Sequence, residues 1–170
     1  FVHAVRDGVG GVDGLDGATD VSVSPDGKHV YATGQNDQML AVFARNLATG
    51  ALSFVTTYRD GLGGVDGLAG VRSVAISADG VHVYAAGAGD NAVAVFQRNS
   101  STGQLTFVEV VKDGVSGVDG LYSVYSVAVS PDDKHVYAAS YGDNAVTVFS
   151  RNASTGKLTY VEMQQDGVNS

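Results

Sequence analysis

The sequence contains no cysteine, only 2 prolines and only 10 basic residues among its 170 positions. The missing cysteines exclude disulfides, thiolate metal sites and cysteine nucleophiles. With 18 acidic residues and a net charge of -8, the chain lacks the clustered Lys and Arg that nucleic-acid binding requires. No apolar run reaches the roughly 18 residues of a membrane-spanning helix. We therefore expect neither a nucleic-acid partner nor membrane insertion.

Glycine is abundant, with 23 residues, and 44% of the chain is hydrophobic. This composition is typical of many tight turns between short strands around an apolar core. The chain begins at Phe1 and not at a methionine, so we expect a piece of a longer or processed product. Removal of an export signal is consistent with this start, and we expect an extracellular, cell-surface or periplasmic location.

One sequence pattern occurs three times in succession, and no insertion interrupts its spacing. Asp7, Asp60 and Asp113, each followed by glycine, are spaced by 53 residues. The segment SPDGKHVYAT at 24–33 returns in the same register as SADGVHVYAA and then as SPDDKHVYAA. A fixed period of this length indicates a repeat protein in which each copy is one supersecondary unit.

Within one copy, turn chemistry separates four strand-like runs. In the second copy, the run 71–77 leads through Ala-Asp-Gly into the run 82–86, and Asp-Gly pairs favour tight turns. The runs AVAVFQRN and LTFVEVVKD follow. The third run is almost continuously apolar, whereas polar residues interrupt the fourth. The unit is predicted to be a four-stranded antiparallel meander, ordered from inner to outer strand, of the size of a propeller blade.

The predicted fold class is all-β, with three tandem blades of a β-propeller and one extra outer strand at the N-terminus. Residues 1–7 match the outer strand of a preceding blade. Blade 1 is predicted over 8–60, blade 2 over 61–113, and blade 3 with the start of the next linker over 114–170.

Three blades fall short of the roughly four to eight that close a propeller. We therefore expect either further blades of the same chain or self-association, in which two copies would form a six-bladed ring. An excised or designed repeat array is a third interpretation that the regular period permits.

The motifs SPDGKHVYAT, GDNAVAVFQRN and TGQLTFVE resemble the bacterial lactonase-like seven-bladed propeller family and, more loosely, the YVTN-type repeats of surface proteins. The resemblance covers the whole chain and implies blade architecture. It also implies sugar-lactone chemistry that uses His, Arg and Glu at one end of the ring. The sequence departs from that implication, since no position matches a catalytic residue of the family.

Two recurring features invite a metal interpretation. His29, His82 and His135 occupy the same place in each copy, but equivalent positions of successive blades lie apart, so we interpret them as supports of a turn and strand.

The Asp-Gly loops suggest a bound calcium ion, because hard cations bind carboxylate oxygens. Calcium is the one cofactor that the sequence suggests. The competing explanation is metal-free turn chemistry. The calcium candidates are Asp7, Asp13, Asp16, Asp60, Asp66, Asp113 and Asp119.

The copies differ most just before and within the inner strand, where propeller ligands commonly reach the ring. We predict a polar and aromatic surface there for a ligand or partner, and neutral loop variation is the competing explanation. The candidate residues are Asp16, Thr19, Asp20, Arg72, Ser73, Tyr122, Tyr125 and Tyr141.

The sequence favours a non-catalytic propeller module that serves as a binding or structural scaffold in a larger assembly. Near-identical blades support this interpretation, because a propeller enzyme needs blade-specific side chains that converge on one site. The alternative is a part of a lactonase-like hydrolase that acts on a sugar lactone. No catalytic residue is assigned in either case.

Overall fold

The computed structural model describes residues 4–167, which form twelve β-strands and no helix. No segment of this part is therefore a helix able to cross a membrane. The strands are β1 (Ala18–Val23), β2 (His29–Gly34), β3 (Met39–Arg45), β4 (Leu52–Arg59), β5 (Val71–Ile76), β6 (His82–Gly87), β7 (Ala92–Arg98), β8 (Leu105–Lys112), β9 (Val124–Val129), β10 (His135–Ser140), β11 (Ala145–Arg151) and β12 (Leu158–Gln165).

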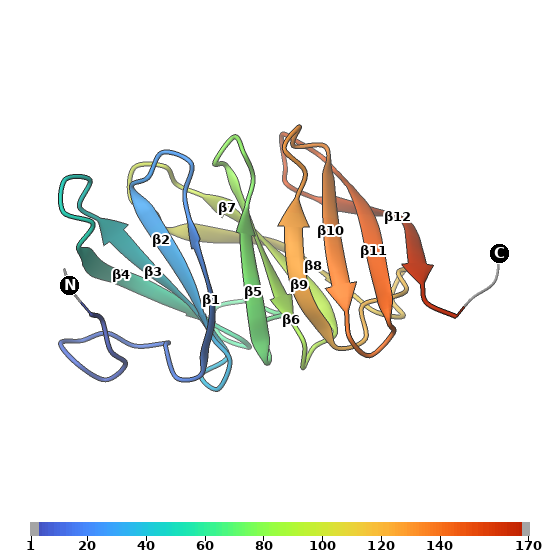
Figure 1. Ribbon diagram of the computed structural model, residues 1–170, viewed down its shortest axis with the longest axis horizontal. Coiled ribbons are helices and arrows are strands. Elements are labelled where there is room, and N and C mark those ends of the chain that lie inside the picture. Colours follow the sequence, from blue (N-terminus) through green and yellow to red (C-terminus); the bar gives the residue numbers. More distant parts are fainter. Residues whose placement is uncertain (1–3, 168–170) are drawn as a thin grey trace.

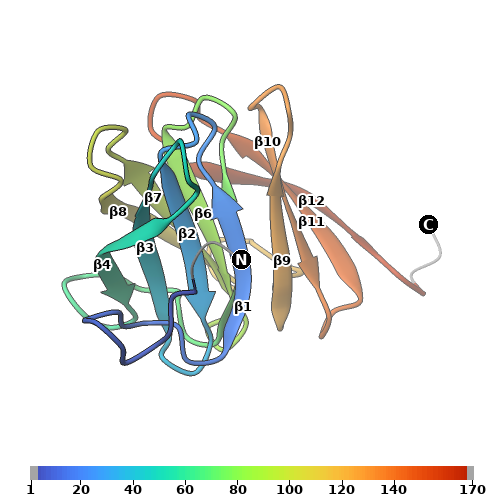
Figure 2. The ribbon, with the colours of Figure 1, turned by 60° about the vertical axis from the view of Figure 1, so that its left-hand side comes forward.

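The strands form three antiparallel four-stranded sheets, ordered β1-β2-β3-β4, β5-β6-β7-β8 and β9-β10-β11-β12. We call these sheets blade 1, blade 2 and blade 3. They stand side by side along the molecule (Figure 1), and the inner strands β1, β5 and β9 contact one another in turn. The second view shows the blades stacked face against face (Figure 2). The predicted all-β propeller architecture is confirmed.

The turn between the first two strands of each blade follows from its sequence. Ser24 Oγ accepts a hydrogen bond from the amide of His29 and donates one to Asp26, so the side chains close the turn locally. Gly27 adopts a φ of 72°, a conformation that glycine permits at no steric cost. In blade 3 this position is Asp133, with a φ of 61°.

The core lies between the blades. Tyr31 and Leu40 of blade 1 pack with Val74 and Phe96 of blade 2, and a second cluster of the same kind joins blades 2 and 3. Because each sheet buries apolar side chains against the next, a single blade cannot bury its own faces.

The extra outer strand expected over residues 1–7 lies partly outside the described residues. In the described part, residues 4–7 form no strand, and the expected edge of a preceding blade is therefore not seen there. Val5 and Val12 instead pack against the face of blade 1 that points away from blade 2, near Phe43 and Phe54.

Candidate functional site

Every inner strand carries a β-bulge at its second residue. The register with the neighbouring strand shifts around Thr19 in blade 1, Arg72 in blade 2 and Tyr125 in blade 3. A bulge bends the strand and redirects a side chain, and bulges are frequent beside active sites. These three residues are among the positions at which the copies differ. The same backbone feature therefore presents a different side chain in each blade.

Three of the predicted residues come together at this end of blades 2 and 3. The guanidinium carbon of Arg72 lies 4.1 Å from the centre of the Tyr125 ring, within the range of a cation–π interaction. The rings of Tyr125 and Tyr141 lie 5.6 Å apart, and both side chains are exposed. We call Arg72, Tyr125 and Tyr141 the inner-end patch.

Two polar atoms near the patch have no hydrogen-bond partner in residues 4–167. They are Arg72 Nε and Ser140 Oγ, and both are buried. Ser140 lines a groove of about 330 Å³ that also includes Tyr125 and Tyr141. Buried polar atoms are costly to leave unpaired, so the hydrogen-bonding capacity of these two atoms is unsatisfied within the described residues. The other groove residues are Ala139, Asn144, Ala145, Val146 and Gln164.

Two other predicted residues hold neighbouring blades together. Asp20 Oδ2 accepts a hydrogen bond of 2.9 Å from the amide of Val74. Ser73 Oγ accepts one of 3.3 Å from the amide of Val127. Both side chains therefore already have a structural partner on the next inner strand.

The remaining predicted residues lie apart from the inner-end patch or make local contacts. Thr19 Oγ1 lies 2.8 Å from Thr33 Oγ1 of the adjacent strand. Asp16 is exposed in the loop before β1. The Tyr122 ring packs over Gly142, at a distance that leaves no space for a larger residue there.

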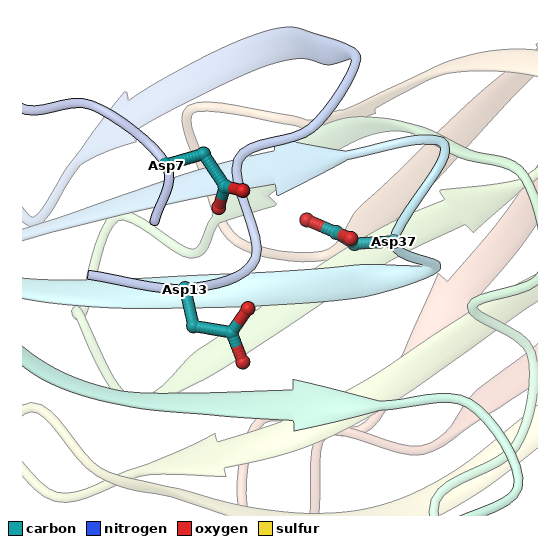
Figure 3. Close-up of side chains that lie close together, drawn as sticks. All are labelled: Asp7, Asp13 and Asp37. Carbon is teal, nitrogen blue, oxygen red and sulfur yellow. The ribbon is translucent and has the colours of Figure 1, made fainter. Parts of the chain in front are cut away.

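The calcium candidates are brought together only in part. Asp7 and Asp13 offer oxygens within 4.8 Å of each other and of Asp37, and Asp60 and Asp66 do so with Asp90. Figure 3 shows Asp7 and Asp37 facing one another across the loop. The sequence analysis did not identify Asp37 or Asp90, although aspartate recurs there with the 53-residue period.

These carboxylates have partners within the chain. Asp60 Oδ1 accepts a hydrogen bond from the amide of Leu68, and equivalent bonds hold the loops of the other blades. Lys112 Nζ lies 2.9 Å from Asp66 and 3.9 Å from Asp90. The hydrogen bond to Asp66 is the main cause that raises the pKa of Lys112. In blade 2 an ammonium group thus supplies the positive charge that the carboxylates require.

A buried arginine joins each pair of blades, a feature that the sequence analysis missed. Arg98 of blade 2 donates hydrogen bonds to Asp26, to the Tyr31 hydroxyl and to its own Gly80 carbonyl. Its Nη2 also lies 2.9 Å from Nδ1 of His29. Arg151 of blade 3 makes the same four contacts with the equivalent residues of blades 2 and 3.

This arrangement fixes the protonation of His29 and His82. A guanidinium group only donates hydrogen bonds, so Nδ1 of His29 must accept and carry no proton. Burial lowers the pKa of His29, and the charge of Arg98 lowers it further. Burial likewise raises the pKa of Tyr31 to about 12. His29 and Tyr31 therefore stay neutral, and Nδ1 of His29 is held by Arg98.

The family model described as "Lactonase, 7-bladed beta-propeller" matches residues 3–118 and 64–169. An uncharacterized protein of Staphylococcus saprophyticus is 25% identical over 150 residues, 88% of this chain and 41% of that protein. One of Staphylococcus aureus is 32% identical over 94 residues, 55% of this chain and 26% of that protein. The chain thus spans less than half the length of these relatives.

Solved structures with the same fold are also similar to this chain. The periplasmic gluconolactonase of Pseudomonas aeruginosa is 25% identical with a TM-score of 0.73, over 87% of this chain and 39% of that one. A putative 6-phosphogluconolactonase of Bacteroides fragilis, 22% identical with a TM-score of 0.72 over 88% and 39%, shares the fold. Since the family model covers nearly all of the three blades whose geometry is described above, the chain belongs to the seven-bladed lactonase family of β-propellers.

Proposed function

We propose that these blades form part of a propeller that binds and hydrolyses a sugar lactone, with the inner-end patch as part of the binding surface. The observation that carries the proposal is the stacking of Arg72 on Tyr125 beside Tyr141 at bulged inner-strand ends. Membership of the lactonase family and the likeness to a gluconolactonase support it.

The chemistry of the patch suits a sugar lactone. The C–H face of a sugar ring packs on exposed aromatic rings and removes apolar surface from water. Hydrolysis adds water to the lactone carbonyl carbon, breaks the ring C–O bond and yields a hydroxy acid with release of a proton. Negative charge develops on the carbonyl oxygen, and the Arg72 guanidinium offers donors that stabilise it.

The patch supplies binding and polarisation but no base. None of the eight residues that line the adjacent groove is Asp, Glu or His. We therefore propose that the base that activates water comes from a group outside this groove.

The test is acid release from glucono-lactone above the spontaneous rate, compared between the chain and its Arg72→Ala variant. Loss of a donor to a developing oxyanion costs about 10²- to 10³-fold in rate, and a loss in that range is expected. Arg59→Ala is the matched control, because Arg59 is exposed at the end of β4, and its rate is expected to equal that of the parent chain.

Two outcomes would contradict the proposal. Equal rates of hydrolysis for the chain and Arg72→Ala would show that the inner-end patch takes no part in the reaction. Gluconate binding that depends on Tyr125 without hydrolysis above background would favour the scaffold interpretation.

A further inference from the structure

The boundary between blades 2 and 3 carries a groove at the outer strands. It has a volume of about 350 Å³ and is lined by β8, by β12 and by the segment that joins the two blades. We call it the outer groove, and its lining includes Glu109, Val111, Val118, Leu158 and Tyr160. Both blades that form it belong to the described chain, and the outer strands lie at the opposite edge of the sheets from the inner-end patch.

The boundary between blades 1 and 2 shows what fills the equivalent place. Tyr58 of β4 is equivalent to Val111, and the centre of its ring lies 6.0 Å from that of the Phe96 ring. The Tyr58 hydroxyl accepts a hydrogen bond of 2.7 Å from the amide of Leu105. A phenol ring therefore joins the outer strands of blades 1 and 2.

The second boundary keeps the amide donor but lacks the ring. Leu158 is equivalent to Leu105, and its amide donates a hydrogen bond of 2.8 Å to Oε1 of Glu109. The Glu109 carboxylate therefore takes the part of the Tyr58 hydroxyl as acceptor. Val111 has no ring to place beside it, and the outer groove opens next to both residues.

The outer groove also has polar groups that the other boundary lacks. Glu109 stands where blade 1 has Thr56, and Tyr160 stands where blade 2 has Phe107. Oε2 of Glu109 lies 3.9 Å from Nζ of Lys157, beyond hydrogen-bond distance. A carboxylate oxygen and an added hydroxyl therefore lie beside apolar side chains.

These features suit a small molecule. Small-molecule sites have volumes from about 300 Å³ upward and combine apolar walls with a few polar groups. Lys112 also lines the outer groove, but its ammonium group is paired with Asp66. Glu109 Oε2 can therefore accept a hydrogen bond from a ligand. The apolar lining includes Val111, Val118 and Leu158.

We propose that the outer groove binds a small phenolic molecule. The phenol ring lies against Val111 and Leu158, as the Tyr58 ring lies between the outer strands at the other boundary. The phenol hydroxyl donates a hydrogen bond to Oε2 of Glu109. The proposal does not depend on the proposed lactone chemistry, because it uses no residue of the inner-end patch.

The test is a titration of the chain with p-cresol, the free counterpart of the tyrosine side chain, followed by methyl NMR. Saturable shifts are expected at the methyl groups of Val111, Val118 and Leu158, with a dissociation constant on the order of 1 mM for so small a ligand. Toluene lacks the hydroxyl group. It is expected to bind about tenfold more weakly, because the hydrogen bond to a charged acceptor is lost.

Exchanging the two equivalent residues should move the site. Val111→Tyr places a ring in the outer groove and is expected to abolish binding of p-cresol there. Tyr58→Val opens the equivalent space between blades 1 and 2, so a second p-cresol is expected, with shifts at Val65 and Leu105. Leu62→Tyr, at an exposed site outside the outer groove, is the control and is expected to bind p-cresol as the parent chain does.

Three results would overturn the proposal. They are the absence of saturable shifts at the methyl groups of the outer groove up to about 10 mM p-cresol, unchanged binding in a folded Val111→Tyr, and equal affinity for toluene. N-Acetyltyrosinamide carries the same ring on peptide groups, and comparable or weaker binding than that of p-cresol supports a small-molecule site. Binding at least about tenfold tighter would assign the outer groove to a protein segment and would also overturn the proposal.

Discussion

At the residue scale, Arg98 shows how one side chain holds two blades. Its side chain is 2% exposed and donates across the boundary to Asp26, whose side chain is 30% exposed. These contacts lower the pKa of Asp26, against the opposing effect of desolvation. A buried guanidinium that lacked these acceptors would be costly, so the arginine and its partners depend on one another.

We expect Arg98→Ala to reduce the free energy of unfolding by about 2 to 4 kcal/mol, because it leaves a buried set of acceptors unpaired while Asp26 is partly screened by water. Arg45→Ala is the matched control at the equivalent position, with one hydrogen bond to lose. Its effect is expected to stay below about 1 kcal/mol. Urea denaturation under the same conditions measures both, and equal losses would contradict the assigned role of Arg98.

The neutral histidines give stability a defined pH dependence. Burial first, and then the neighbouring arginine, lowers the pKa of His29 and of His82 below the ordinary value of 6.5. As the pH falls through 6.5, the unfolded state binds protons before the folded state does. The free energy of unfolding is therefore expected to be highest above pH 6.5 and to fall as the pH drops toward the lower folded pKa values.

Denaturation at about pH 7.5 and about pH 5.5 checks this, because in that window the histidines are the side chains that titrate at their ordinary pKa. Asp26 and Asp79 remain ionised there, since their pKa values lie below 3.8. The difference in stability between the two pH values is expected to shrink in His82→Gln. A variant with an undiminished difference would show that His82 does not titrate in this way.

At the element scale, the loop between the third and fourth strands of blades 2 and 3 docks on the preceding blade. Gly103 and Gly156 meet the rings of His29 and His82, whereas Gly50 meets open space. All three have φ near 76°, so alanine carries the same backbone strain at each position. The three loops differ only in what lies opposite.

Gly103→Ala is therefore expected to cost about 1 to 3 kcal/mol more than Gly50→Ala, because the added methyl group overpacks the His29 contact. Thermal denaturation of the two variants under the same conditions gives the difference. Equal costs would mean that the loop is free to move away from His29.

The strands and turns could be predicted because their causes are local. The Ser-x-Asp-Gly turn and the apolar alternation in 24–33 lie within a few residues of each other. By contrast, the contact of Arg98 with His29 joins residues that are 69 positions apart in the sequence. It forms only when neighbouring blades are aligned with one another. The same limit applies to the candidate site. Differences between the three copies identified Arg72, Tyr125 and Ser73 alike. Only the packing of the blades shows that Ser73, unlike the other two, is bound to the next blade.

At the scale of the whole molecule, the three near-identical repeats are in different environments. Blade 2 is covered on both faces, whereas blades 1 and 3 are each covered by another blade on one face. In a repeat array, stability is the sum of the repeats and the interfaces between them. The middle blade therefore has the most stabilising contacts, although its sequence is nearly that of its neighbours.

Hydrogen exchange should report this difference. Amides of β6 and β7 are expected to exchange more slowly than the equivalent amides of β2, β3, β10 and β11, because opening blade 2 breaks two interfaces. A gradient that is absent would show that the blades do not stabilise one another.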